Sequence, residues 1–298
     1  MLNEHVYEDK AMGTDAVISI VSKDEEISNT LGAQALQTIH NYENQFSRFL
    51  PQSELSVLNN VKEKIVSDTF LDATQEAYRL FVVTHGIFNP LVQINRFGYA
   101  LSFDDPNFGK DATEDTTPYD INFSETIIDL PHKKITLRAG QMLDFGGFLK
   151  GYLATHLCNH IASFYPHITG VIVNIGGDIH TYGLDHKEKL FVFAIYNPIT
   201  NTEIHVPVHN SSIATSGSYK RNWKQGGRNV HHILDSTGKD NPETEIVSAT
   251  VLHKEGSTAE AYAKVFLSVG PTKAQELLSE EKISFIVIDA HGQVTKNI

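Results

Sequence analysis

The chain has 298 residues, 41% of them hydrophobic and 20% charged, which is an ordinary composition for a globular protein with a sizeable core. Its formal net charge of −12 and the lack of any cluster of lysine and arginine argue against a surface that binds nucleic acid. The single cysteine, Cys158, excludes a disulfide framework and a thiolate metal cluster and is expected to pack in the core, and no apolar run is long enough to span a membrane.

The N-terminal part predicts a strand followed by a long helix. Residues 1–9 lack the charged and apolar segments of a secretory signal, so the sequence as it stands predicts a cytoplasmic protein, although a lipoprotein trimmed of its leader would look the same. A β-rich run predicts a strand over 15–21, entered through the tight turn Met12-Gly13-Thr14. The capping-box spacing of 22–25 and the apolar residues at helical spacing over 27–46 predict an amphipathic helix.

A second helix and an irregular stretch follow. A short helical turn is expected within 46–59, and Asp68 is expected to cap a helix that Gly86 ends. Residues 89–90 leave the helical region because a proline restricts the residue before it. Residues 101–125 are acidic and irregular, and we expect an exposed insertion there rather than a linker. The whole chain is therefore expected to be a single domain of two joined lobes.

The chain is organised around 144–151, Asp-Phe-Gly-Gly-Phe-Leu-Lys-Gly, which leads into apolar residues at helical spacing up to Phe164. The predicted helix begins on glycines and carries Lys150 in its first turn. Free backbone N–H groups, the positive end of the helix dipole and an ammonium group would converge there, which favours an anion such as a phosphate. The spacing is not that of a Walker A loop. A glycine-packed turn without a ligand accounts for the same residues.

The C-terminal half predicts strands and helices without a regular βαβ alternation, which favours an α+β fold over a doubly wound sheet. An apolar strand over 170–175 ends in Gly176-Gly177-Asp178, which fits either a ligand at the end of a strand or a bulge. Thr215-Ser216-Gly217 is expected to form a hydroxyl-rich turn, and 231–238 a strand that runs into a turn. The other predicted elements are strands over 191–196, 212–215, 247–252 and 283–288, a helix from about Thr258 and a helix over 272–278.

Short motifs that follow one another in this order resemble those of the ApbE family of FAD:protein FMN transferases, from Met12 to about Gly270. Each motif is weak alone, and their order makes the resemblance specific. The motifs are Met12-Gly13-Thr14; Phe46-Ser47-Arg48-Phe49 with Ser53-Glu54-Leu55-Ser56 and Asn59; Gly86-Ile87-Phe88-Asn89-Pro90; 144–151; 173–178; Thr215-Ser216-Gly217; His232-Ile233-Leu234-Asp235 with Thr237-Gly238; and Ala259-Glu260-Ala261.

The resemblance implies an α+β fold of the ApbE, T-fold-type kind, with a flavin cleft between two lobes. Members of the family bind FAD, use a divalent metal ion, usually Mg²⁺, on the pyrophosphate, and pass FMN to a Thr or Ser hydroxyl of an acceptor flavoprotein with release of AMP. The implied partner is such an acceptor, for example a subunit of an NADH:quinone or fumarate-type reductase. The alternatives are an FAD pyrophosphatase, with water in place of the protein hydroxyl, and an FAD-binding protein with weakened catalysis.

The resemblance also implies roles for individual residues. The expected catalytic residues are Lys150, His232 and Asp235. The expected contacts to the cofactor are Met12, Phe49, Ile87, Phe88, Asn89, Asp144, Lys150, Thr215 and Ile233. The metal-binding positions are Gly147, Glu260 and Lys264. A histidine such as His232 is by itself more often a surface or core residue, and the adjoining turn with Asp235 strengthens the catalytic interpretation.

The sequence departs from the family's pattern at three places, the last of them a pair of positions. Asn89 stands where the family usually has Asp, and Ser236 where it usually has Pro. Glu260 and Lys264 replace an Asp and a Thr that bind the metal one helical turn apart. Protonated Lys264 has no acceptor for a metal ion, so it either forms an i,i+4 salt bridge with Glu260 or neutralises the pyrophosphate in place of the ion. The second alternative predicts FAD binding with little or no metal dependence, by a weakened or specialised transferase.

Overall fold

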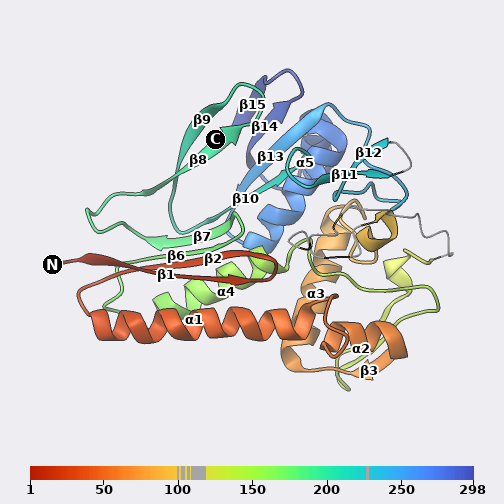
Figure 1. Ribbon diagram of the computed structural model, residues 1–298, viewed down its shortest axis with the longest axis horizontal. Helices are drawn as coiled ribbons and strands as arrows, with labels where there is room; N and C mark the ends of the chain where they lie inside the picture. The colour runs from red at the N-terminus through yellow and green to blue at the C-terminus, as the bar shows by residue number, and fades with distance from the viewer. Residues whose placement is uncertain (99–100, 102–104, 106–107, 109–118, 226–227) are drawn as a thin grey trace.

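The computed structural model describes the chain except for residues 99–100, 102–104, 106–107, 109–118 and 226–227. Its centre is a sheet of eight strands, with each neighbouring pair antiparallel (Figure 1). In spatial order the strands are β1 (Asn3–Ala11), β2 (Thr14–Ser22), β6 (Gly170–Ile175), β7 (Asp178–Gly183), β10 (Ser212–Gly217), β13 (Ile246–His253), β14 (Ser284–Asp289) and β15 (Val294–Asn297).

Three helices cover one face of this sheet: α1 (Glu25–Phe46), α4 (Leu149–Phe164) and α5 (Gly256–Leu277). The first two pack on β1, β2 and β6, and α5 packs on β10, β13 and β14 (Figure 1). Alternate residues of the same strands, such as Ile213 and Ile286, point to the other face. There a hairpin of β8 (Phe191–Asn197) and β9 (Thr202–Val208) covers them.

A second hydrophobic core lies beside the sheet and forms the other lobe (Figure 1). Aromatic rings dominate it: Phe46 lies 5.2 Å from Phe70 and 5.7 Å from Phe145, measured between ring centroids. The elements of this lobe are α2 (Glu54–Val61), α3 (Asp68–Val83), η2 (Phe123–Glu125) and a sheet of β3 (Glu63–Ile65), β5 (Lys134–Thr136) and β4 (Ile127–Asp129). A helical turn η1 (Ile94–Phe97) and a hairpin of β11 (Asn222–Gln225) and β12 (Arg228–His231) complete the described elements.

The predicted helices are present, but two helix starts are wrong by a residue or two. The capping box over 22–25 does not form, because α1 begins later and the Asp24 carboxylate accepts the N–H of Ile27 at 3.0 Å. Asp68 is the first residue of α3 rather than its cap, since the Ser67 hydroxyl accepts the N–H of Phe70 at 3.2 Å.

Two other predictions are corrected in part. The expected turn Thr215-Ser216-Gly217 is the end of strand β10, paired with β13 throughout. Most of the expected insertion 101–125 lies outside the described residues. Its described end is only partly exposed, because Phe123 is fully buried in the aromatic core whereas Asn122, Ser124 and Glu125 are exposed. Cys158 is buried as expected, and burial raises the pKa of its thiol. Within the described ranges, no helix is long and apolar enough to cross a membrane.

Candidate active site

The first turns of α4 and α5 meet at a contact between two glycines. A Cβ atom on Gly151 would lie 2.3 Å from the carbonyl oxygen of Gly256, and one on Gly256 would lie 2.2 Å from the carbonyl oxygen of Gly151. The Gly256 N–H donates to the hydroxyl of Thr155 at 2.9 Å, which ties the two helices together. Backbone contact without side chains therefore brings Lys150 of α4 close to Glu260 of α5.

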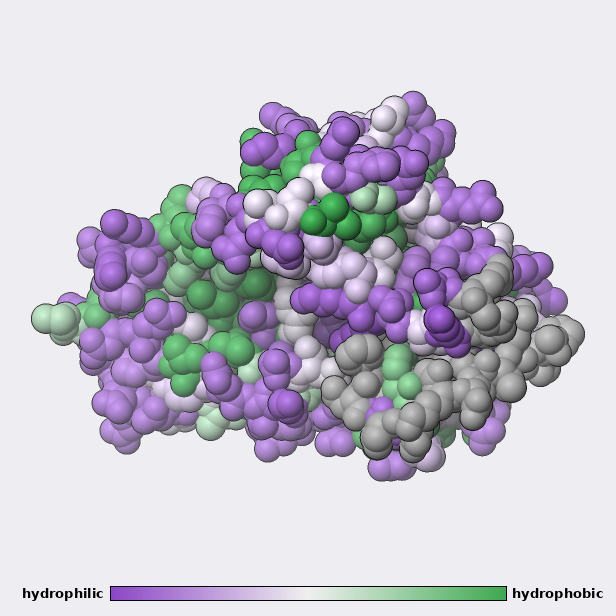
Figure 2. Space-filling view, turned by 45° about the horizontal axis from the view of Figure 1, so that its top comes forward, coloured by the Kyte–Doolittle hydropathy of each residue, from purple (hydrophilic) through white to green (hydrophobic). Residues whose placement is uncertain are grey.

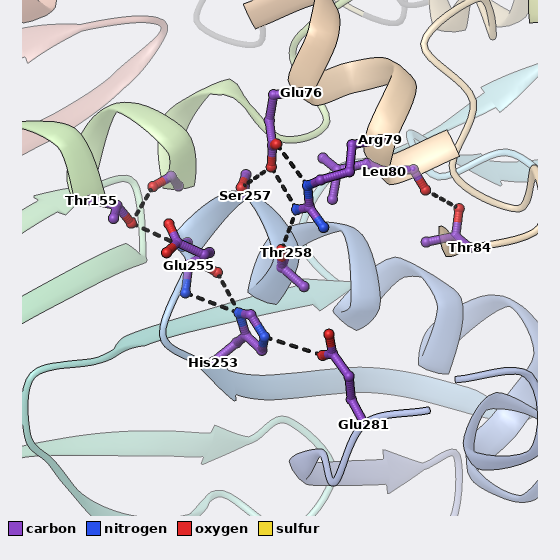
Figure 3. Close-up of polar contacts among 12 residues, drawn as sticks. Glu76, Arg79, Leu80, Thr84, Thr155, His253, Glu255, Ser257, Thr258 and Glu281 are labelled. Carbon is purple, nitrogen blue, oxygen red and sulfur yellow. Dashed lines mark hydrogen bonds and ion pairs between the residues drawn. The ribbon is translucent and has the colours of Figure 1, made fainter. Parts of the chain in front are cut away.

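The start of α5 is also fixed from the other lobe. Figure 3 shows Glu76 and Arg79 of α3 reaching to the first residues of α5. The Ser257 hydroxyl donates to the Glu76 carboxylate, and Arg79 donates to the hydroxyl of Thr258 and to Glu76. These polar contacts between the lobes hold the helix that carries Glu260 and Lys264.

A buried cluster of four charges lies at this junction. The Lys150 ammonium donates to the Asp178 carboxylate and lies 3.6 Å from Glu260 Oε1. Lys264 Nζ lies 3.2 Å from the same oxygen, and the N–H of Gly151 donates to Glu260 Oε2 at 3.2 Å. Two cations and one helix N-terminus thus neutralise two carboxylates.

The pKa values in the cluster follow from these contacts. Burial alone would lower the pKa of Lys150, but the carboxylates of Asp178 and Glu260 raise it well above its ordinary value. Burial would raise the pKa of Glu260, yet Lys150 and Lys264 hold it below its ordinary value. Burial and the Glu260 carboxylate raise the pKa of Asp178 against the opposing effect of Lys150. Lys150 and Glu260 therefore stay charged near neutral pH.

The cluster does not fit a divalent cation. An ion bound to Glu260 Oε1 at the ~2.0–2.1 Å of a Mg²⁺–oxygen bond would lie against the ammonium groups of both Lys150 and Lys264. Among the residues that the structure describes, no group of three His, Cys, Asp or Glu side chains could hold a metal ion. Glu260 and Lys264 form the i,i+4 salt bridge that the sequence offered as one alternative.

Two cavities join at the charge cluster, and Figure 2 shows the hollowed face of the molecule, with hydrophobic side chains along the hollow. The smaller cavity, about 220 Å³, lies between the lobes and is mainly apolar. The larger, about 800 Å³, extends under β8 and along β10. The residues that line both cavities are Gly13, Gly146, Lys150, Arg221, His232 and Lys264.

The structure brings all the predicted site residues to these two cavities. Glu260 and Thr215 line only the larger one. The predicted residues that line the smaller one are Met12, Phe49, Ile87, Phe88, Asn89, Asp144, Gly147, Lys150, His232, Ile233, Asp235 and Lys264. Their individual contacts to a ligand stay predictions.

An exposed aromatic ring stands at the wall of the smaller cavity. Phe49 is 43% exposed, and the Arg48 guanidinium lies 4.4 Å from the centre of its ring. Arg48 Nε also lies 3.5 Å from Asp144 Oδ2, while Asp144 Oδ1 accepts the N–H of Gly146 at 2.8 Å. This pairing holds the first residues of the 144–151 stretch at the cavity wall, beside the Phe49 ring.

The hydrogen bonds of the Asn89 side chain account for an amide at this position, where the family usually has a carboxylate. Its side-chain N–H donates to the carbonyl of Ile121 at 2.9 Å, and its Oδ1 accepts the N–H of Leu91 at 2.9 Å. An ionised Asp could accept from Leu91 but could not donate to Ile121. The amide thus fixes the cavity loop to the segment before η2.

His232 lies where the two cavities join. Its Nδ1 is 3.3 Å from the carbonyl oxygen of Arg221, a contact that places the ring proton on Nδ1 and leaves Nε2 as an acceptor. Burial lowers the pKa of His232 to about 3, with further contributions from Arg221 and Lys264. The imidazole is therefore neutral near pH 7, and its Nε2 is a hydrogen-bond acceptor.

The carboxylate of Asp235 is hydrogen-bonded within its own turn. Its Oδ1 accepts the hydroxyl of Thr237 at 2.7 Å and the N–H groups of Thr237 and Lys239 at 3.1 and 3.2 Å. The hydrogen bonds of its carboxylate within the described chain come from its own turn. Asp235 thus shapes the loop after His232.

A model of the ApbE family matches residues 12–287. The chain belongs to the ApbE family. It is 23% identical to an FAD:protein FMN transferase of Klebsiella pneumoniae (strain 342), over 97% of this chain and 85% of that protein. It is 26% identical to an FAD:protein FMN transferase of Vibrio cholerae, over 88% of this chain and 80% of that protein.

Solved structures of ApbE proteins share the fold. The flavin transferase ApbE from Vibrio cholerae has a TM-score of 0.79 at 22% identity and covers all of this chain, which spans 97% of that structure. The ApbE protein from Thermotoga maritima has a TM-score of 0.85 at 20% identity, over 99% of this chain and 97% of that structure. The predicted α+β, ApbE-like fold is confirmed.

Two site residues of this ApbE-family chain were not given a role from the sequence. Asp178 pairs with Lys150, and the signal for it was present, because it directly follows the two glycines that end strand β6. Arg221 lines both cavities and precedes the irregular hairpin of β11 and β12, where the sequence carries no distinctive pattern.

Proposed function

We propose that this chain is an FAD:protein FMN transferase, and that the junction of the two cavities is where transfer takes place. One feature of the site carries the proposal. The two cavities join at four shared side chains, as a reaction between a dinucleotide and a second, larger substrate requires: Lys150, Arg221, His232 and Lys264. The names of the similar proteins support the choice of FAD and a protein acceptor.

The reaction needs charge stabilisation more than covalent help. The acceptor hydroxyl oxygen would bond to the phosphorus of the FMN half while the pyrophosphate P–O bond breaks and AMP leaves. Lys150, Lys264 and Arg221 can neutralise the charge on the phosphoryl oxygens. His232 Nε2 can take the hydroxyl proton, and Phe49 can stack on a ring of the dinucleotide.

Co-expression with a candidate acceptor tests the proposal. The acceptor class that we propose is a reductase subunit of the NADH:quinone or fumarate type. We expect covalent flavin on a Thr or Ser of the acceptor, detected by mass spectrometry, with one AMP released for each flavin attached. AMP release from FAD without any acceptor would instead favour a pyrophosphatase. Bound flavin with neither product would leave an FAD-binding protein.

We also propose that Lys264 acts in place of a metal ion, so that FAD binding needs no Mg²⁺. EDTA is expected to leave FAD affinity unchanged, as measured by quenching of flavin fluorescence. Lys264→Thr should weaken binding about tenfold in EDTA, because one charge-assisted contact to the pyrophosphate is lost. The variant should recover affinity and transfer in Mg²⁺, because Thr supplies an oxygen ligand.

The matched control is Lys273→Thr. Lys273 is an exposed lysine of the same helix that pairs with Glu276 and lines neither cavity, so this variant should behave like the unaltered protein. Transfer by the unaltered protein that depends fully on Mg²⁺ would rule out the lysine-for-metal proposal.

A further inference from the structure

Among the residues that the structure describes, one edge of strand β10 has no partner strand along part of its length. On one side β10 pairs with β13 from Ser212 to Gly217. On the other it pairs with β7 only at Ser212 and Ile213, because β7 begins at Asp178. Beyond Ile213 this second edge of β10 faces the larger cavity.

The direction of the free backbone groups follows from the register. The N–H of Ser218 donates to Val247 on β13, so even-numbered residues of β10 direct their N–H and C=O groups to β13. The carbonyl oxygen of Ser211 accepts the N–H of Thr181, which belongs to β7. Odd-numbered residues of β10 therefore direct their N–H and C=O groups to the β7 side. Thr215 and Gly217 therefore direct their N–H and C=O groups into the cavity, and no residue in the described chain pairs with them there.

The walls around this edge suit an extended polypeptide. Gly176, Gly177 and Phe193 of β8 also line the cavity, and a Cβ atom on Gly177 would meet nothing within 4 Å. Lys220 and Arg221 line the cavity directly after β10, which favours an acidic residue in the bound segment. The same cavity reaches Lys150 and His232, where the second substrate of the proposed reaction must present its hydroxyl.

We infer that the larger cavity binds an extended segment of the acceptor protein, which adds to β10 as an antiparallel or parallel strand through the backbone groups of Thr215 and Gly217. This inference rests on the proposed function and specifies its second substrate. Main-chain hydrogen bonds give the affinity and orient the segment, so that its Thr or Ser hydroxyl points to the charge cluster. Recognition of the backbone does not require a particular side chain at each position of the bound segment.

A pair of variants at Gly217 tests the inference. Gly217→Pro removes an N–H that only the bound segment uses and places a ring in its path, while the ladder to β13 keeps its hydrogen bonds. Gly217→Ala is the control, because its Cβ meets the Tyr219 ring just as that of proline does, at 2.6 Å before relaxation. We expect Gly217→Pro to lower transfer to a short threonine peptide, selected from a synthetic library, at least about tenfold relative to Gly217→Ala. FAD binding should be the same in both variants.

A scan of the peptide backbone gives a second test that does not depend on the folding of a variant. N-methylation at successive positions of the selected peptide should lower transfer at every second position, because alternate N–H groups of an added strand bond to its neighbour. Uniform tolerance of N-methyl groups, or equal loss in the two Gly217 variants, would overturn the inference while leaving the transferase proposal intact. Failure to bind FAD, or to release AMP in the presence of any protein acceptor, would count against the proposed function itself.

Discussion

Lys150→Met is expected to abolish FMN transfer and to destabilise the protein by about 3–5 kcal/mol, because it leaves two buried carboxylates without their main counter-ion. Asp178 and Glu260 are 5% and 4% exposed in their side chains, so water cannot replace the ammonium. The same ammonium belongs to the first turn of α4, where we propose that the pyrophosphate binds. Urea unfolding and flavin fluorescence would measure the two effects separately.

A double variant distinguishes the two roles of Lys150. Lys150→Met with Asp178→Asn removes a carboxylate along with its partner, and Glu260 keeps Lys264 and the N–H of Gly151. Much of the stability should return, because fewer unpaired charges stay buried. Transfer should not return. Normal transfer by the single variant would show that the cluster only supports the fold.

His232→Gln is expected to slow transfer by about 10²–10⁴-fold, the usual contribution of a general base, with a much smaller effect on FAD affinity. Glutamine fills a similar space but cannot take the hydroxyl proton. The control is His231→Gln, since His231 is the neighbouring histidine and lines neither cavity. Single-turnover rates with saturating FAD would measure the step directly. Equal slowing in the two variants would contradict the assigned role.

The stability of the protein at acid pH gives an independent check on His232. Its pKa is about 3 in the folded protein and near the ordinary 6.5 when unfolded, so the unfolded chain binds more protons between these values. Stability contributed by the neutral imidazole is therefore lost progressively as the pH falls from 6.5 toward 3. His232→Gln should reduce the slope of unfolding free energy against pH in this window. An unchanged slope would show that the imidazole is not buried in its neutral form.

The sequence predicted best those elements whose burial pattern is periodic. Helices α1 and α4 and strand β6 follow from apolar residues at regular spacing, and each is present. Strand β1 was not predicted, because it is an exposed edge strand rich in charged residues and has no apolar run. The turn expected at Thr215 is a strand because pairing with β13 overrides the local preference of small hydroxyl residues.

The candidate site was likewise predicted from the sequence only in part. Motif order placed Phe49, Asp144 and His232 at one cleft although they are far apart in the chain. The ion pair of Lys150 with Asp178 could not be read from spacing, since it depends on how α4 and β7 pack in three dimensions. The partner of a buried charge is specified by tertiary packing and not by local sequence.

The bare contact between α4 and α5 has a consequence for how the cleft can vary. The main chains of α4 and α5 touch at Gly151 and Gly256, and this contact fixes the distance between the two helices. A methyl group added at either glycine would push the helices apart and lengthen the distances between the charged groups that they carry. Substitution of the side chains that line the two cavities can adapt the cleft to another acceptor or to another ring. The distance between α4 and α5 is thus the dimension of the cleft that tolerates substitution least, and two residues without side chains set it.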